Sequence, residues 1–190
     1  MASSGAAPIG AASRPIVLIG MMGSGKSTVG RRLAARLGRR FVDADRFLEE
    51  RCGVAIATIF ELEGEEGYRR REAALVDDLT RRPDLVLATG GGAVLLDENR
   101  RRLRERGCVI YLSATAHDLW LRLRHDRARP LLRTPDPRRR IAELVDARGP
   151  LYSECAHLTV STGRQPVERV VMEIVAALSA CPSPDLVQNA

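Results

Sequence analysis

Residues 20–28 read GMMGSGKST, and this stretch constrains the fold more than any other part of the chain. It fits the pattern G-x-x-x-x-G-K-[ST], in which glycines let backbone N–H groups close around phosphate oxygens without a Cβ in the way. A short apolar run at residues 16–19 precedes it, and apolar residues at helical spacing follow it as far as Gly38. A strand, a glycine-rich turn and a helix in this order predict a phosphate-binding loop at the positive N-terminal end of the helix.

The lysine of this motif, Lys26, is the only lysine in the chain, and all the other residues among the 30 lysines and arginines are arginine. A planar guanidinium is a poor replacement for a compact ammonium on a flexible stem, so this position specifically requires lysine. In such loops the lysine reaches the β- and γ-phosphates of a nucleotide, and the next hydroxyl holds Mg²⁺. The predicted nucleotide site, with Mg²⁺ as cofactor, comprises Gly23, Ser24, Gly25, Lys26, Ser27 and Thr28.

Length and composition predict one domain with a small lid. The chain has 190 residues, of which 45% are hydrophobic and 28% are charged. We expect a disordered extension at residues 1–13 rather than a signal peptide, an ordered domain at 14–180 and a flexible tail at 181–190. No apolar run approaches the ~20 residues that a membrane span needs. We therefore expect no membrane partner. The four cysteines include no C-x-x-C pair, so we expect buried thiols and a cytoplasmic location.

The net charge of +6 raises the question of a nucleic-acid partner. The arginines are spread over many segments, often beside acidic residues, and aromatic residues make up only 4% of the chain. These features disfavour nucleic-acid binding, while a positive balance suits a polyanionic nucleotide and an acidic small substrate. We expect a monomer, because the core accounts for the apolar residues.

Five apolar segments alternate with helical patterns along the chain. This alternation predicts a parallel sheet covered by helices on both faces, a three-layer α/β/α fold with right-handed crossovers. The expected strands are residues 16–19, 40–45, 85–89, 108–112 and 158–162. The expected helices lie at 26–37, 46–51, within 53–64, and at 68–82, 97–106, 116–124, 138–148 and 167–178, with Ile56, Ile59, Phe60 and Leu62 facing inward in the third of them.

Polar or glycine residues follow two of these strands, where ligands bind in open α/β sheets. Asp43 and Asp45 share a face if the strand continues through both, so one suits the Mg²⁺ shell and the other a substrate hydroxyl. Alternatively, Asp45 only caps the next helix. Glycines at 90–92 follow the third strand, and they indicate either a backbone site for a ligand carboxylate or a tight turn.

The stretch from Arg122 to Arg140 is rich in arginine and contains three prolines. This composition fits a mobile lid that brings arginine over phosphates, and it equally fits a plain surface loop.

Taken together, these motifs resemble those of the shikimate kinases, within the nucleoside-monophosphate-kinase-like group of P-loop proteins. The resemblance runs from about residue 14 to 180, and no plain Walker-B aspartate is present. It implies the sheet order 2-3-1-4-5, a mobile lid at about 124–137, ATP as co-substrate, and phosphorylation of the shikimate 3-hydroxyl. The alternative is a P-loop kinase for another hydroxylated substrate, such as gluconate. The matching pieces are residues 20–28, 43–45, 64–69, 90–92, 129–132 and 148–152.

The resemblance also implies roles for single residues. Asp45 would act on the attacking hydroxyl, and Asp43 would support Mg²⁺ through water. Arg69 and Arg148, with the backbone around Gly91 and Gly92, would hold the substrate carboxylate, and Glu72 would orient Arg69. Arg129 would descend with the lid onto the transferring phosphoryl group, and Gln165 would contact the adenine side of ATP.

Overall fold

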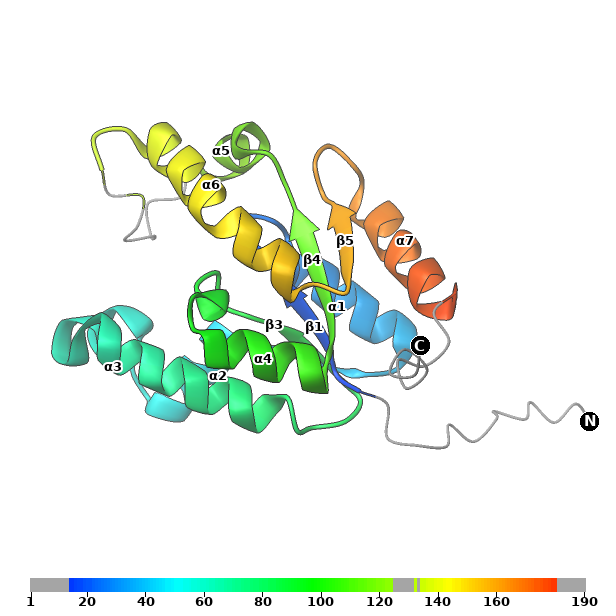
Figure 1. Ribbon diagram of the computed structural model, residues 1–190, viewed down its shortest axis with the longest axis horizontal. Helices are drawn as coiled ribbons and strands as arrows, with labels where there is room; N and C mark the ends of the chain where they lie inside the picture. Colours follow the sequence, from blue (N-terminus) through cyan, green and yellow to red (C-terminus); the bar gives the residue numbers. More distant parts are fainter. Residues whose placement is uncertain (1–13, 125–131, 133, 181–190) are drawn as a thin grey trace, which may run out of the picture.

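The computed structural model describes residues 14–124, 132 and 134–180, and within them five parallel strands form one sheet (Figure 1). Its order, β2-β3-β1-β4-β5, confirms the order implied by the family resemblance. The predicted strand ends are correct to within two residues. The strands are β1 (Ile16–Ile19), β2 (Arg40–Asp43), β3 (Leu85–Ala88), β4 (Cys108–Ser113) and β5 (Leu158–Ser161).

Helices cover both faces of this sheet, as the alternating pattern predicts (Figure 1). On one face, α1 and α7 pack against Ile16 and Leu18 of β1. On the other face, α2 to α6 supply the apolar residues that pack with Val17 and Ile19, because successive strand residues point to opposite faces. The helices are α1 (Lys26–Leu37), α2 (Ala44–Cys52), α3 (Ile56–Leu79), the 3₁₀ turn η1 (Ala93–Leu95), α4 (Asp97–Arg106), α5 (Ala116–Leu123), α6 (Pro137–Cys155) and α7 (Val167–Ala180).

Helix α3 corrects two predictions. We expected two helices separated by a break over residues 64–67, but only Gly64 leaves the helical conformation, with φ 70° and ψ −175°. The expected inward side is also wrong in part: Ile59 is buried, whereas Phe60 is 38% and Leu62 is 79% exposed. Apolar spacing could not reveal this, because the kink turns the first part of the helix relative to the rest.

Helix α6 is longer than predicted. The pair Gly149–Pro150 was expected to end it, but it continues to Cys155. Proline inside a helix removes one backbone hydrogen bond and normally kinks or ends the helix. Here the last turns carry Tyr152 and Cys155, both 1% exposed, and burial of these side chains offsets the loss. The extension matters because it places Arg148 and Tyr152 on one continuous element.

No helix in the described ranges is long and apolar enough to span a bilayer. Among the cysteines in these ranges, Cys155 is buried as expected, whereas Cys52 and Cys108 are only partly buried, which corrects the prediction of buried thiols for these two.

Replacing a buried leucine of α1 tests the packing of this helix against the sheet. Leu33 is fully buried between the sheet, α1 and α7, so Leu33→Ala should lower the free energy of unfolding by about 2–5 kcal/mol through lost burial and a residual cavity. Arg36→Ala on the exposed side of the same helix should cost less than about 1 kcal/mol. Urea denaturation followed by circular dichroism measures both, and equal effects would contradict this packing.

Candidate active site

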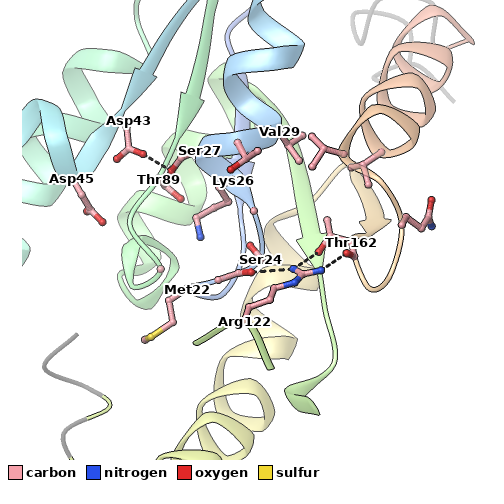
Figure 2. A pocket seen from close by; sticks show the side chains of 17 residues that line it. Met22, Ser24, Lys26, Ser27, Val29, Asp43, Asp45, Thr89, Arg122 and Thr162 are labelled. Carbon is pink, nitrogen blue, oxygen red and sulfur yellow. Dashed lines mark hydrogen bonds between the residues drawn. The ribbon is translucent and has the colours of Figure 1, made fainter. Parts of the chain in front are cut away.

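One cavity of about 540 Å³ opens at the carboxyl edge of the sheet (Figure 2). Figure 2 shows Asp43, Asp45 and Thr89 on one side of Lys26, and Arg122 and Thr162 on the other. Ligands bind in such positions in open α/β sheets, beyond the ends of the strands. The lining residues are Met22 to Val29, Asp43, Asp45, Thr89, Gly91, Arg122, Thr162, Gln165, Val167 and Val170.

The loop at residues 20–28 has the backbone of a phosphate cradle. Gly20, Gly23 and Gly25 all have positive φ (139°, 77° and 96°), and Gly25 is the N-cap residue just before α1. A Cβ on Gly20 would lie 2.6 Å from the carbonyl oxygen of Leu112, so only glycine fits there. The Ser24 hydroxyl is buried and has no hydrogen-bond partner within the described residues. A phosphate oxygen would satisfy this buried donor, so the loop fits the ligand that its sequence predicts.

Lys26 lies in the first turn of α1 and is only 9% exposed. Its Nζ atom donates to the carbonyl oxygens of Gly20 at 2.8 Å and Met21 at 2.9 Å. The loop therefore holds the ammonium at the cavity, where it can meet the phosphates of a bound nucleotide.

Ser27 and Asp43 form the part of the site that suits a metal ion. The Ser27 hydroxyl donates to Oδ2 of Asp43 at 2.5 Å. Asp43 also caps α2, because its Oδ1 accepts the N–H of Arg46 at 3.4 Å. In the described residues no group of three or more His, Cys, Asp or Glu side chains could hold a metal. A hard cation here would need oxygen ligands from nucleotide and water as well, as Mg²⁺ usually has.

The structure corrects the prediction for Asp45. Strand β2 ends at Asp43, and Asp45 lies in the first turn of α2, so the two carboxylates do not share a strand face. The alternative prediction, that Asp45 caps this helix, is also wrong, because Asp43 does so. Asp45 still lines the cavity, and its Oδ1 accepts a hydrogen bond from the Tyr68 hydroxyl at 3.3 Å.

The glycines at 90–92 form a turn against which several charged side chains pack. A Cβ on Gly90 would lie 2.7 Å from Oε1 of Glu72 and 2.9 Å from Oδ1 of Asp45. A Cβ on Gly92 would lie 2.6 Å from Nη2 of Arg69. The turn predicted as one alternative is therefore present, and its missing side chains make room for charged groups. The other alternative, a backbone site for a ligand carboxylate, stays a prediction.

Two arginines from different helices reach this turn. Arg69 of α3 pairs with Glu72, with Nη1 2.6 Å from Oε2. Arg148 of α6 is 8% exposed, and its Nη1 donates to the carbonyl oxygen of Gly91 at 3.3 Å. Burial raises the pKa of Glu72, and the adjacent Arg69 guanidinium partly offsets this. The predicted pairing of Glu72 with Arg69 is thus present in the structure.

Tyr152 belongs to the site, although its role was not predicted from the sequence. Its hydroxyl donates to the Gly91 carbonyl at 2.5 Å, and burial raises its pKa to about 12. The residue stands in the Arg-Gly-Pro-Leu-Tyr segment, so its four-residue spacing from Arg148, one helical turn, was the available signal.

Arg122 is a second residue of the site that sequence patterns do not single out, because it begins the arginine-rich stretch 122–140 that fits either a lid or a surface loop. It lies in α5 and donates to the carbonyls of Gly23, at 3.0 Å, and Thr162 (Figure 2). It also donates to the carbonyl of Gly163. It therefore links the phosphate-binding loop to the end of β5. Gln165 lines the same cavity, on the loop that follows β5, and its Nε2 donates to Ser161 at 3.5 Å. Nothing in the sequence alone separated Arg122 from the arginines that follow it.

The prediction for Arg129 lies outside the described residues, as do residues 125–131 and 133 of the predicted lid. The predicted segments 1–13 and 181–190 also lie outside them.

A parallel sheet in this order, with the glycine-rich loop between β1 and α1, defines a P-loop nucleotide-binding protein. The shikimate kinase family model matches residues 22–179. The chain therefore belongs to the shikimate kinase family and is an ATP-dependent kinase.

Individual relatives agree with this assignment. Over 163 residues the chain is 53% identical to the shikimate kinase of Burkholderia thailandensis, covering 86% of this chain and 89% of the relative. It is 54% identical over 166 residues to that of Bordetella pertussis, covering 87% and 79%. The structure of shikimate kinase from Acinetobacter baumannii in complex with shikimate matches with a TM-score of 0.85 and 42% identity, covering 88% and 94%.

A gluconokinase from Sinorhizobium meliloti also matches, with a TM-score of 0.55 and 19% identity, covering 89% of this chain and 93% of that one. At that identity the match shows a shared fold and does not favour gluconate.

Gly90→Ala tests the close packing of carboxylates over the glycine turn. The new methyl group would meet Glu72 and Asp45, so we expect a loss of about 1–3 kcal/mol in the free energy of unfolding from overpacking. Gly149→Ala is the matched control, because a Cβ there meets nothing within 4 Å and alanine favours the helix. Thermal unfolding of both variants measures the difference. A Gly90→Ala protein as stable as the Gly149→Ala protein would contradict the packing.

Proposed function

We propose that this chain transfers the γ-phosphoryl group of ATP to the 3-hydroxyl of shikimate, giving shikimate 3-phosphate and ADP. The observation that carries the proposal is that the P-loop and Asp45 line one cavity, while two arginines converge on the glycine turn beside it. A phosphate site next to a pair of guanidinium groups suits a small alcohol that bears a carboxylate. Membership in the shikimate kinase family supports the choice of substrate.

The nucleotide phosphates bind the backbone of Gly23, Ser24, Gly25 and Thr28, with Lys26 on the β- and γ-phosphates and Gln165 toward the adenine. Ser27, whose hydroxyl donates to Asp43, and Asp43 itself would hold Mg²⁺, Asp43 through water. When bound, the ion neutralises phosphate charge. The residues themselves fix the loop: Lys26 is buried and held by two carbonyls, so little further ordering is needed on binding.

The substrate carboxylate binds Arg69, Arg148 and the turn at Gly91 and Gly92. Both guanidinium groups are already oriented, Arg69 by Glu72 and Arg148 by the Gly91 carbonyl. Orientation before binding lowers the entropic cost of a bidentate contact.

This placement directs the acceptor hydroxyl toward Asp45. The hydroxyl oxygen bonds to the γ-phosphorus while the bond from that phosphorus to the bridging oxygen breaks, and ADP leaves with the bridging oxygen. The hydroxyl proton passes to Asp45. Lys26, and Arg129 from the lid, spread positive charge over the transferring group. Lid closure at about residues 124–137 excludes water and limits wasteful ATP hydrolysis.

The same proposal includes the domain, the oligomeric state, the location and the partners of the enzyme. One ordered domain at residues 14–180 acts as a monomer in the cytoplasm, with ATP and shikimate as its partners and neither nucleic acid nor membrane. The small number of large apolar side chains exposed in the described residues supports the monomer.

A coupled ADP-release assay tests the reaction. With ATP, Mg²⁺ and shikimate we expect ADP formation that depends on shikimate and exceeds the rate with gluconate. Product analysis should find phosphate on the 3-oxygen. Folded protein that releases no ADP in response to shikimate would refute the proposal, and a preference for gluconate would favour the alternative.

Arg148→Ala tests the carboxylate site. Loss of a charged hydrogen bond to the substrate is worth about 1.5–3 kcal/mol, so the KM for shikimate should rise about 10- to 100-fold while the KM for ATP stays within about twofold. Arg138→Ala, on the exposed side of the same helix, is the control. Because Arg148 is buried, Arg148→Lys provides a second variant that keeps the charge. An unchanged KM for shikimate in both Arg148 variants would contradict this role.

A further inference from the structure

Tyr68 brings a buried hydroxyl to the carboxylate groups of the site. It lies in α3 shortly after the kink at Gly64 and is 6% exposed. Its ring stacks on Phe60 with centroids 4.6 Å apart, and the Arg69 guanidinium lies 5.2 Å from the ring centroid. These contacts hold the ring, and its hydroxyl reaches Asp45 in the first turn of α2.

The hydroxyl stands between two carboxylates. It is 3.3 Å from Oδ1 of Asp45 and 3.3 Å from Oε1 of Glu72. The missing Cβ of Gly90 lies within 3.3 Å of all three oxygens, so they converge over this glycine. A tyrosine has one proton to donate, and both neighbours are acceptors when ionised. The single proton of the hydroxyl is therefore shared between Oδ1 of Asp45 and Oε1 of Glu72.

The surroundings keep this hydroxyl protonated. Burial, together with the nearby Asp45 and Glu72, raises the pKa of Tyr68 well above its usual range. Charged groups on three elements lie at or near this cluster: Arg69 of α3 pairs with Glu72, Lys26 of α1 lines the same cavity as Asp45, and Arg148 of α6 reaches Gly91 in the glycine turn. Burying a hydroxyl without a partner is costly, so the two carboxylates also account for a tyrosine at this position.

We propose that Tyr68 is a positioning residue for phosphoryl transfer, whose hydroxyl holds Oδ1 of Asp45 so that Oδ2 meets the acceptor hydroxyl. The terminal torsion of an aspartate is broad, so a carboxylate without this contact samples other orientations. Because Tyr68 shares the same hydroxyl with Glu72, it also ties Asp45 to the arginine that Glu72 orients. This role rests on the proposed function, in which Asp45 receives the hydroxyl proton.

Tyr68→Phe removes the hydroxyl and keeps the ring stacking. Hydrogen bonds to charged groups are worth about 10-fold or more in rate when they act in the transition state, so kcat with shikimate should fall about 10-fold. The KM values for ATP and shikimate should stay within about twofold, because the nucleotide and carboxylate contacts remain. An unchanged kcat in Tyr68→Phe would overturn the proposal.

Tyr111→Phe is the matched control. The Tyr111 ring stacks on Tyr152, and its hydroxyl makes no hydrogen bond to the described residues. This variant should keep the wild-type kcat. Thermal unfolding of both tyrosine variants shows whether a lost rate reflects a lost fold.

A double-mutant cycle separates positioning from a general structural effect. If Tyr68 acts through Asp45, Tyr68→Phe should lower the rate no further once Asp45→Asn is present. Losses that multiply in the double variant would mean that Tyr68 acts independently of Asp45, and would overturn the proposal.

A measurement without turnover distinguishes failure of this inference from failure of the proposed function. In the wild-type protein the NMR resonance of the Tyr68 hydroxyl proton should be visible through slow exchange with water, should vanish in Tyr68→Phe and should shift in Asp45→Asn. A wild-type enzyme without shikimate-dependent ADP release would refute the function and leave this test valid. The positioning role would be overturned if the hydroxyl proton exchanges rapidly with water, or if its resonance does not shift in Asp45→Asn.

Discussion

All five strands run parallel, so their carboxyl ends meet along one edge, and each part of the site depends on that arrangement. β1 leads into the phosphate-binding loop, β2 ends at Asp43, and β3 ends just before the glycine turn. Residues about 70 positions apart in the chain thus become neighbours: the Thr89 hydroxyl donates to the Leu18 carbonyl at 3.2 Å. Helices α3, α5 and α6 bring the arginines Arg69, Arg122 and Arg148 to this edge.

The site also depends on glycines, because a residue without a side chain lets other groups approach the backbone closely. Glycines bring the backbone of the 20–28 loop near phosphate oxygens, and the glycines at 90–92 leave space for Asp45, Glu72 and Arg69. A buried ion pair such as Arg69–Glu72 adds little net stability, because desolvation of both groups opposes their attraction. Its contribution is geometric: it holds a guanidinium in one orientation beside the turn.

Local sequence patterns predicted the elements that depend on residues close together in the chain. The phosphate-binding loop, the five strands and their parallel sheet followed from glycine spacing and apolar runs. The family resemblance supplied the strand order. Contacts between distant segments could not be predicted from the same patterns. Arg122 looks like its neighbours until the fold brings it to Gly23 and to the residues after β5, and Tyr68 meets Asp45 only through the packing of α2 on α3. The end of α6 was misjudged because burial of Tyr152 outweighs the local effect of Pro150.

The solitary lysine has a practical consequence. Lys26 is the chain's only side-chain amine, and it stands where the nucleotide phosphates are expected. Amine-directed acylating reagents therefore have a single side-chain target, held by two carbonyl groups at the floor of the cavity. Mass spectrometry of the peptide that contains Lys26, which excludes acylation of the α-amino group, would then report occupancy of the nucleotide site without an engineered label.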